Sequence, residues 1–479
     1  MIVRWIGGAR TRFEIRGPAA PLTGAVVGGA RLRYLGHGKM DPRLRSGLAA
    51  AVSLAVLAAC GTVELQGIGR EEAGGGAPGT GGGPTGGSEP ACAVPLAERV
   101  QVRAVDVGSA VVASDEYHPT VVAPAADGGS LLAWRAAGLE EIHVTWLDAD
   151  DAPVATSPAV PGLEVHAALA HDDGGGAIVV LADDPDIYSA QHCTADLTQY
   201  CARLDLVRFD ATGAVNWQTK LTGDENVAVD GALFVYWYQH TARLAFASDT
   251  YGVYFRSARS VVDANEPTGV ALHAGDTFRF VDAGGALLEG GWDWGCSHSW
   301  SVRLAYDGVW AAACHGDPYP PGMRVTILEP GGTRGQVTFS EGVDPSERAL
   351  GGLVPRDGAF FLSHVTLGED GERAAHLATV DDDGTLTSDV EITLADPIDG
   401  VYPFRAYMAA YGEDRFLLGY KSGGELMIAV IDEQGGVVEG PVAIDAPIDN
   451  FSEFVATPDG DVIWAHSDGG VTVTRVDGC

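Results

Sequence analysis

Residues 471–479 read VTVTRVDGC, an alternating run of β-branched and polar residues that ends in an acidic residue and a glycine. Alternation with a period of two indicates a half-buried β-strand. The same unit, a strand followed by an acidic turn, recurs seven times along the chain. Its acidic residues are Asp148, Asp210, Asp282, Glu329, Asp381, Asp432 and Asp477. The differences between successive positions are 62, 72, 47, 52, 51 and 45 residues.

A second recurring element precedes each of these strands: a tight turn and then a very apolar strand. Five of the turns contain Asp-Gly, which favours reversal of the chain. They begin at Asp127, Asp173, Asp307, Asp357 and Asp459, and looser versions occupy 249–252 and 412–414. Four of the six intervals match the length of a β-propeller blade, and the first two imply long inserted loops. The sequence therefore predicts an all-β fold of seven four-stranded blades.

The seventh unit has only three strands, because the chain stops after 471–479. An unpaired outer edge would favour aggregation. A spare strand, ERVQVRAVDVG at 98–108, precedes the first unit and can complete the last blade. This arrangement resembles the closure of WD-repeat and kelch propellers, although neither repeat motif is present. We therefore predict a seven-bladed propeller over 92–479, closed by its N-terminal strand.

The amino-terminal region has the features of an export signal. Residues 40–61 read MDPRLRSGLAAAVSLAVLAACG: two arginines precede a 12-residue apolar run that is too short to span a bilayer. Its end, LAAC-G at 57–61, resembles the lipobox of bacterial lipoproteins. The resemblance implies lipidation of Cys60, and Gly61 favours the outer membrane. The expected segments are 1–39, an upstream mis-assigned start or extended n-region; 40–59, the signal peptide; 60–91, the lipidated Cys and a flexible Gly-rich linker; and 92–479, the propeller.

The charge balance excludes some partners. The 479 residues include 30 Lys and Arg against 65 Asp and Glu, a formal net charge of −35. Nucleic acid and anionic lipid surfaces both require clustered positive charge, so neither is an expected partner. The acidic residues are spread along the chain, which is typical of a soluble, self-repelling surface. We expect a monomer attached to the membrane by its lipid alone.

The six cysteines that remain after Cys60 form an even set, which suggests disulfides outside the cytoplasm. The propeller topology pairs Cys92 with Cys479, which would lock the ring, Cys193 with Cys201 within one loop, and Cys296 with Cys314 in blade four. The alternatives are free thiols or a metal site, and the absence of a C-x-x-C pair argues against the metal site.

Long loops gather on one face of blades two to four, at 182–201, 256–273 and 314–323. Binding sites commonly occupy such loops on a rigid scaffold. The candidate ligand-binding residues there are Tyr236, Trp237, Trp292, Asp293, Trp294, His298, Trp300, His315, Asp317 and Tyr319. Aromatic rings beside carboxylates suit a sugar or a peptide side chain. Packing between blades is the favoured alternative for these tryptophans, and His298, His315 and Asp317 could instead form a metal or acid–base site.

No motif indicates a catalytic activity. The chain lacks G-x-S-x-G and H-E-x-x-H, and 381–384, Asp-Asp-Asp-Gly, lacks the ligand spacing of a calcium loop. We therefore expect no cofactor and no metal. The leading prediction is an envelope module that binds or scaffolds an unknown protein or glycan. The alternatives are an extracytoplasmic hydrolase or lyase with its site on blades two to four, and a structural envelope component.

Overall fold

The computed structural model divides the chain into two compact units, Met1–Gly87 and Ser88–Cys479. The residues that it describes are 2–6, 12–16, 22–27, 30–35, 92–113, 120–183, 202–222, 233–234, 242–262, 270–292, 296, 301–316, 322–340, 347–368, 371–399, 405–449 and 452–478. In the first unit, β1 (Ile2–Ile6) pairs with β2 (Arg12–Arg16), and β3 (Leu22–Val27) pairs with β4 (Ala30–Leu35). The predicted signal peptide, Cys60 and the linker lie outside the described residues.

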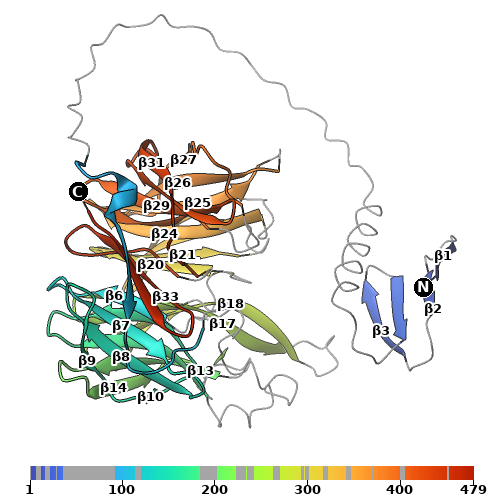
Figure 1. Cartoon of the computed structure of the whole chain (residues 1–479). Coiled ribbons are helices and arrows are strands. Elements are labelled where there is room, and N and C mark those ends of the chain that lie inside the picture. Colours follow the sequence, from blue (N-terminus) through green and yellow to red (C-terminus); the bar gives the residue numbers. More distant parts are fainter. Residues whose placement is uncertain are drawn as a thin grey trace, which may run out of the picture. The chain divides into compact units, whose positions relative to one another are not determined.

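The second unit is a seven-bladed β-propeller, which confirms the predicted fold class (Figure 1). Blade one contains β6 (Thr120–Pro124), β7 (Ser130–Arg135), β8 (Glu141–Leu147), β9 (Pro153–Thr156) and β10 (Val160–Pro161). Blade two contains β11 (Glu164–Ala170), β12 (Gly176–Asp183), β13 (Ala202–Phe209) and β14 (Val215–Lys220). Blade three contains β15 (Leu233–Phe234), β16 (Ala242–Ala247), β17 (Thr250–Val262), β18 (Val270–Asp282) and β19 (Leu287–Trp292).

The remaining blades follow the same order. Blade four contains β20 (Ser301–Asp307), β21 (Val309–His315), β22 (Met323–Glu329) and β23 (Gly332–Phe339). Blade five contains β24 (Arg348–Arg356), β25 (Ala359–Leu367), β26 (Arg373–Asp381) and β27 (Leu386–Ile392). Blade six contains β28 (Tyr407–Tyr411), β29 (Arg415–Ser422), β30 (Glu425–Ile431) and β31 (Val437–Ile444). Blade seven contains β32 (Val455–Ala456), β33 (Val462–Ser467), β34 (Val471–Val476) and β5 (Val100–Val105).

The last blade takes its outer strand from the other end of the propeller. The strand β5 pairs antiparallel with β34, in a register that places Thr474 opposite Val102. In Figure 1 the short blue helix η1 (Leu96–Arg99) leads into this strand, which runs beside the red strands of blade seven. The Asp477 backbone N–H also donates to the Arg99 carbonyl at 3.1 Å. The predicted closure of the ring is therefore confirmed.

The recurring acidic turn has one geometry in five blades. In each, one carboxylate oxygen accepts hydrogen bonds from the backbone N–H groups two and four residues later, which fixes the hairpin between the third and fourth strands. The five residues are Asp148, Asp210, Asp282, Asp381 and Asp432. Residues 381–384 thus form the ordinary turn that their spacing predicts.

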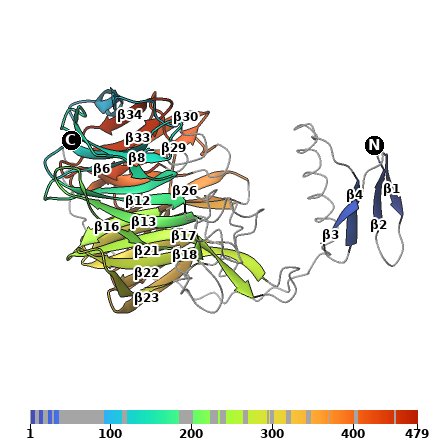
Figure 2. The ribbon, with the colours of Figure 1, turned by 90° about the horizontal axis from the view of Figure 1, so that it is seen from below.

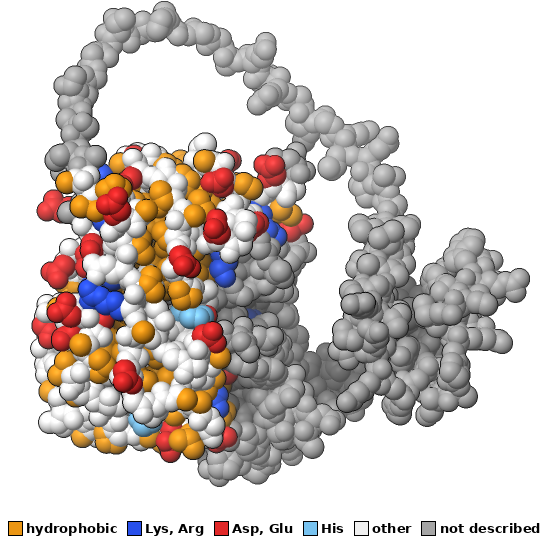
Figure 3. All heavy atoms as spheres, viewed as in Figure 1, with side chains coloured by type: hydrophobic (Ala, Val, Ile, Leu, Met, Phe, Trp, Pro, Cys, Tyr) orange, Lys and Arg blue, Asp and Glu red, His pale blue; other side chains and the backbone are white. Residues whose placement is uncertain are grey.

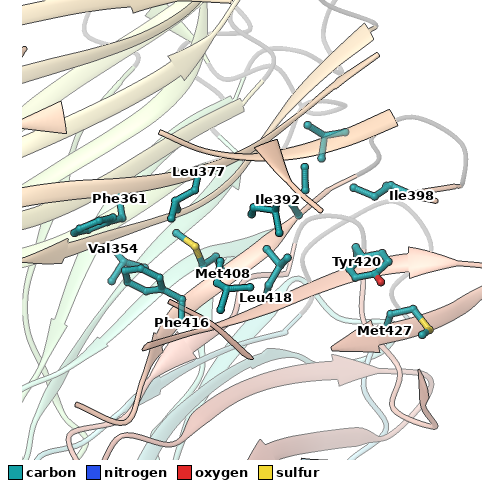
Figure 4. Close-up of a cluster of buried hydrophobic side chains, with 14 of the residues drawn as sticks. Val354, Phe361, Leu377, Ile392, Ile398, Met408, Phe416, Leu418, Tyr420 and Met427 are labelled. Carbon is teal, nitrogen blue, oxygen red and sulfur yellow. The ribbon is translucent and has the colours of Figure 1, made fainter. Parts of the chain in front are cut away.

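The core consists of buried clusters that lie between successive blades. The cluster between blades five and six includes Phe361, Leu377 and Leu418, whose side chains interdigitate in Figure 4. The cluster that joins blade seven to blade one contains Trp134 and Val473, both almost fully buried. Because apolar side chains fill the closing interface as they fill the other six, the ring has no open seam.

One predicted loop is wrong. Residues 256–273 were expected to form a long loop, but most of them belong to β17 and β18, which pair from Arg256–Asp276 out to Val262–Val270. The two strands extend beyond their blade as a protruding hairpin (Figure 2). At its base the hydroxyl groups of Ser257 and Thr277 are hydrogen-bonded at 2.7 Å. The two hydroxyl groups therefore satisfy each other across a strand pair.

Asp and Glu side chains are dispersed over the visible face of the described residues, rather than gathered in one tract (Figure 3). Among those residues, none belongs to a helix of the length and hydropathy that crossing a membrane would require.

Candidate functional site

The innermost strands of the seven blades enclose a central cavity of about 400 Å³. Every blade contributes lining residues, and much of the wall is apolar, with Leu244, Leu304 and Met408 among its members. A volume of this size is in the range of small-molecule sites. The innermost strands all run in the same direction, so residues at their starts meet at one end of the cavity. We define the channel mouth as Arg243 and Glu453, which line the cavity, together with Arg303, which lines a small adjoining pocket and contacts Glu453.

Two arginines from different blades share one carboxylate at the channel mouth. The Nε atoms of Arg243 and Arg303 lie 2.6 Å and 2.8 Å from Oε1 of Glu453. The two arginine side chains are 8% and 3% exposed, and that of Glu453 is 29% exposed. The three residues therefore form a buried group with one more positive than negative charge.

Arg303 also holds two blades together. Its guanidinium donates to the backbone carbonyls of Val302, Leu350 and Gly351, the last two in blade five. Burial lowers the pKa of Arg303 well below its ordinary value; Glu453 opposes this shift, and the charges of Arg243 and Arg405 add to it. Because an arginine keeps its proton in proteins, this unfavourable environment favours a nearby anion over loss of the proton.

The guanidinium of Arg243 has fewer hydrogen-bond acceptors than that of Arg303. Its Nη1 donates to the Ala242 carbonyl at 2.6 Å. Within the described part of the chain, its buried Nη2 has no hydrogen-bond acceptor. A buried donor without an acceptor costs about 1–3 kcal/mol, so a ligand that accepts from this nitrogen would recover that energy.

A buried acidic residue on the innermost strand of blade two carries little negative charge. Glu164 is buried at the start of β11, and His166 lies 3.5 Å away and lines the cavity. Burial raises the pKa of Glu164 to about 8, although His166 and Arg135 act in the opposite direction. At neutral pH the side chain is therefore mostly protonated.

A second hollow, of about 480 Å³, lies between blades two and three. It contains His171, whose Nε2 is 2.7 Å from the Tyr251 hydroxyl, and the ion pair of Arg208 with Asp173 at 2.5 Å. The pKa of His171 is lowered to about 4, mainly by burial and also by the charge of Arg208, with Asp173 acting in the opposite direction. The imidazole is neutral at physiological pH, and the hollow has no excess positive charge comparable to that of the mouth.

Only two of the ten candidate ligand-binding residues can be placed, Trp292 and His315. Trp292 packs against Tyr254 and Phe278, with ring centroids 5.6 Å and 5.1 Å apart. His315 ends β21 and is fully buried. Both occupy packed positions, as the alternative of packing between blades predicts. Outside the described residues lie Tyr236, Trp237, Asp293, Trp294, His298, Trp300, Asp317 and Tyr319.

The predicted disulfide between Cys296 and Cys314 is not formed. Both residues are buried free thiols that interact with each other, next to Tyr254 and Asp276. Burial raises the pKa of the Cys314 thiol, and its contact with Cys296 adds to the effect. Disulfide formation proceeds through a thiolate, so the raised pKa of Cys314 disfavours its oxidation at neutral pH.

Cys92 does form a disulfide. Neither Cys296 nor Cys314 is its partner, since both are free. Pairing with Cys479 remains a prediction, as do the Cys193–Cys201 bridge and the lipid on Cys60.

A repeated arginine in the sequence indicates the channel mouth, although it belongs to no known motif. Arg243 and Arg303 occupy the same position in TARLAF (241–246) and SVRLAY (301–306), the innermost strands of consecutive blades. Repetition of a charged residue on an otherwise apolar strand indicates a shared environment. Glu453 has no such counterpart, and only closure of the ring brings it to the pair.

No protein-family model matches this chain, and no curated protein sequence does. Solved structures match at low similarity. Hydrazine synthase of Kuenenia stuttgartiensis has 14% identity and a TM-score of 0.48, over 76% of this chain and 98% of that one. A puromycin-hydrolysing peptidase of Mycobacterium tuberculosis has 16% identity and a TM-score of 0.42, over 80% of this chain and 53% of the peptidase chain. The six-bladed lectin of Aleuria aurantia has 12% identity and a TM-score of 0.35, over 70% of this chain and 99% of the lectin chain. Likenesses this weak carry no argument about activity.

Proposed function

We propose that this propeller is a binding module of the bacterial cell envelope, and that its ligand presents a small anionic group to the channel mouth. The observation that supports this is the pair of buried guanidinium groups, Arg243 and Arg303, that share the single carboxylate of Glu453. Arginine forms strong, charge-assisted hydrogen bonds with carboxylates. A ligand carboxylate at Nη2 of Arg243 would balance the remaining charge.

The size of the cavity favours a small ligand. A space of about 400 Å³ accommodates a single sugar ring or a molecule of similar size. The apolar wall, with Leu244 and Met408, suits the carbon face of a sugar ring, while the mouth suits its acid group. Among glycans, the proposal therefore favours one with an acidic sugar over a neutral one.

The envelope location is a part of the proposal that rests on the sequence alone. The positive n-region, apolar core, LAAC-G motif and Gly-rich linker occur in the order that a lipoprotein requires. The lipid on Cys60 would hold the protein at the membrane, and the linker would let the propeller stand away from it.

The test measures binding of a charged and a neutral sugar to the full-length protein by calorimetry. We expect glucuronate to bind and glucose not to bind. Arg243→Gln should weaken glucuronate binding about 10- to 100-fold, since it removes a charge-assisted hydrogen bond. Arg208→Gln is the control, because its side chain is 9% exposed, close to the 8% of Arg243, but belongs to the second hollow.

Equal binding of both sugars, absence of glucuronate binding, or full retention of it in Arg243→Gln would refute the proposal. Cleavage of glucuronides by the wild-type protein would instead support the hydrolase alternative.

A further inference from the structure

Blade five presents two histidines and an aspartate on one face, from three adjacent strands. His364 lies on β25 and is directly opposite His376 on β26. Asp389 lies on β27 opposite Ala378, two residues along from His376. Because side chains two residues apart point to the same face of a sheet, the three side chains converge. This group is separate from the channel mouth and from the second hollow.

The distances within the group suit a metal ion. Oδ1 of Asp389 is 2.9 Å from Nε2 of His364 and 3.9 Å from Nδ1 of His376. All three potential ligand atoms lie within 4.8 Å of one another. Zinc bonds to these atoms are about 2.0–2.2 Å long, which places tetrahedral ligands about 3.3 Å apart. The two distances to Asp389 bracket that value. The two imidazole rings lie at an angle of 11° to each other, so the partly exposed His376 ring would tilt on binding to direct its Nδ1 at the ion.

The surroundings hold the side chains as a metal site requires. The second nitrogen of His376, Nε2, is 2.9 Å from the Thr366 hydroxyl, a contact that orients the ring. The centroid of the His364 ring lies 5.5 Å from that of the Phe339 ring of blade four and 4.8 Å from that of the His376 ring. His364 is fully buried, whereas the side chains of His376 and Asp389 are 20% and 27% exposed, which leaves a path for an ion.

We propose that His364, His376 and Asp389 bind one divalent transition-metal ion, for which zinc is the best match. Two imidazoles exclude a preference for calcium or magnesium, which favour oxygen ligands. Three protein ligands leave a fourth position for water or a ligand, as in zinc sites that are not purely structural.

The test uses the untagged full-length protein, stripped with a chelator and dialysed against Zn²⁺ or Co²⁺. We expect one ion per chain at this site, and the visible absorption of tetrahedral cobalt. Asp389→Asn, which keeps the shape of the side chain, and His376→Asn should each weaken binding at least about tenfold. A melting curve of each variant without metal shows whether it is folded.

His466→Asn is the matched control. Nδ1 of His466 lies 2.7 Å from Oδ1 of Asp449, and its side chain is 19% exposed, but the described residues offer it no second imidazole. Its substitution should leave metal binding unchanged. Absence of metal binding by the wild-type protein, or unchanged binding in a folded His376→Asn variant, overturns the proposal. If Asp389→Asn fails to fold, His376→Asn decides the question.

Discussion

Arg475 in β34 of blade seven donates a 3.0 Å hydrogen bond to Asp151 in blade one, 324 positions earlier in the chain. Asp151 also accepts from Arg103 of β5 at 3.2 Å, and its side chain is 1% exposed. A single buried carboxylate therefore joins the first blade to both strands that complete the last one. The ring is closed by charge as well as by strand pairing.

Removal of that carboxylate should weaken the closed ring. We expect Asp151→Asn to lower the free energy of unfolding by about 3 kcal/mol, because Arg475 would be left buried with less compensation. Asparagine also tolerates the positive φ of 59° at this position, so backbone strain is not introduced. Urea denaturation followed by tryptophan fluorescence measures the change.

The neighbouring Asp150 provides the control. Its side chain is 92% exposed and lies 3.9 Å from Arg103. Asp150→Asn should change the free energy of unfolding by no more than about 0.5 kcal/mol. Equal effects of the two substitutions would mean that the buried ion pair does not stabilise the closure.

The bulge in β24 should tolerate no side chain at Gly351. A Cβ there would lie 1.9 Å from the Ala406 carbonyl oxygen and 2.2 Å from the Ser363 hydroxyl. We expect Gly351→Ala to destabilise the protein by about 3 kcal/mol. Gly331→Ala, where a Cβ has no atom within 4 Å, should be nearly neutral in the same thermal unfolding assay. A neutral Gly351→Ala would show that blades five and six are less tightly packed than the structure indicates.

Stability should fall in mild acid because of His171. The pKa of this imidazole is about 4 in the folded protein, below its ordinary value of 6.5, so between these values the unfolded chain binds the proton more tightly. The contribution of His171 is thus complete above pH 6.5 and is lost as the pH falls towards 4. The loss is about 1–2 kcal/mol after solvent screening.

The comparison for His171 is the difference between two stability curves, for the wild-type protein and for His171→Gln. That difference should change between pH 6.5 and 4 and be flat above pH 7. A difference that is constant across the whole range would contradict the low pKa.

The predicted lipid attachment gives a direct test in cells. Labelled palmitate should be incorporated into the wild-type protein and not into Cys60→Ser, since the resemblance to a lipobox makes this thiol the acceptor. Cys92→Ser should keep the label. Incorporation into Cys60→Ser would show that lipid is attached elsewhere or that the motif is fortuitous.

The blades could be predicted because their signals are local. A turn such as 381–384 is stabilised by hydrogen bonds from one carboxylate to backbone groups within four residues, so the same letters recur in each blade. The pairing of β5 with β34 could also be predicted, because the seventh unit lacks its fourth strand and one strand before the first unit has no partner there. The protruding hairpin at 256–273 could not, since its small polar residues match loop composition.

The candidate sites were hidden because they depend on distant contacts. Glu453 meets Arg243 across 210 positions, and neither residue lies in a recognisable motif. The metal-binding group on blade five requires the exact strand register, which places His364 opposite His376. Aromatic residues such as Trp292 were the predicted ligand-binding residues instead, although aromatic side chains pack between blades as readily as they bind ligands.

The pairing of β5 with β34 imposes an order on biogenesis. During synthesis, β5 is made before the rest of the propeller and stays unpaired with β34 until almost all of the remaining polypeptide has followed. A product truncated by premature termination would expose that edge and the adjacent apolar faces to proteases. Completion of synthesis is thus coupled to resistance against degradation, so that the architecture itself distinguishes finished molecules from unfinished ones.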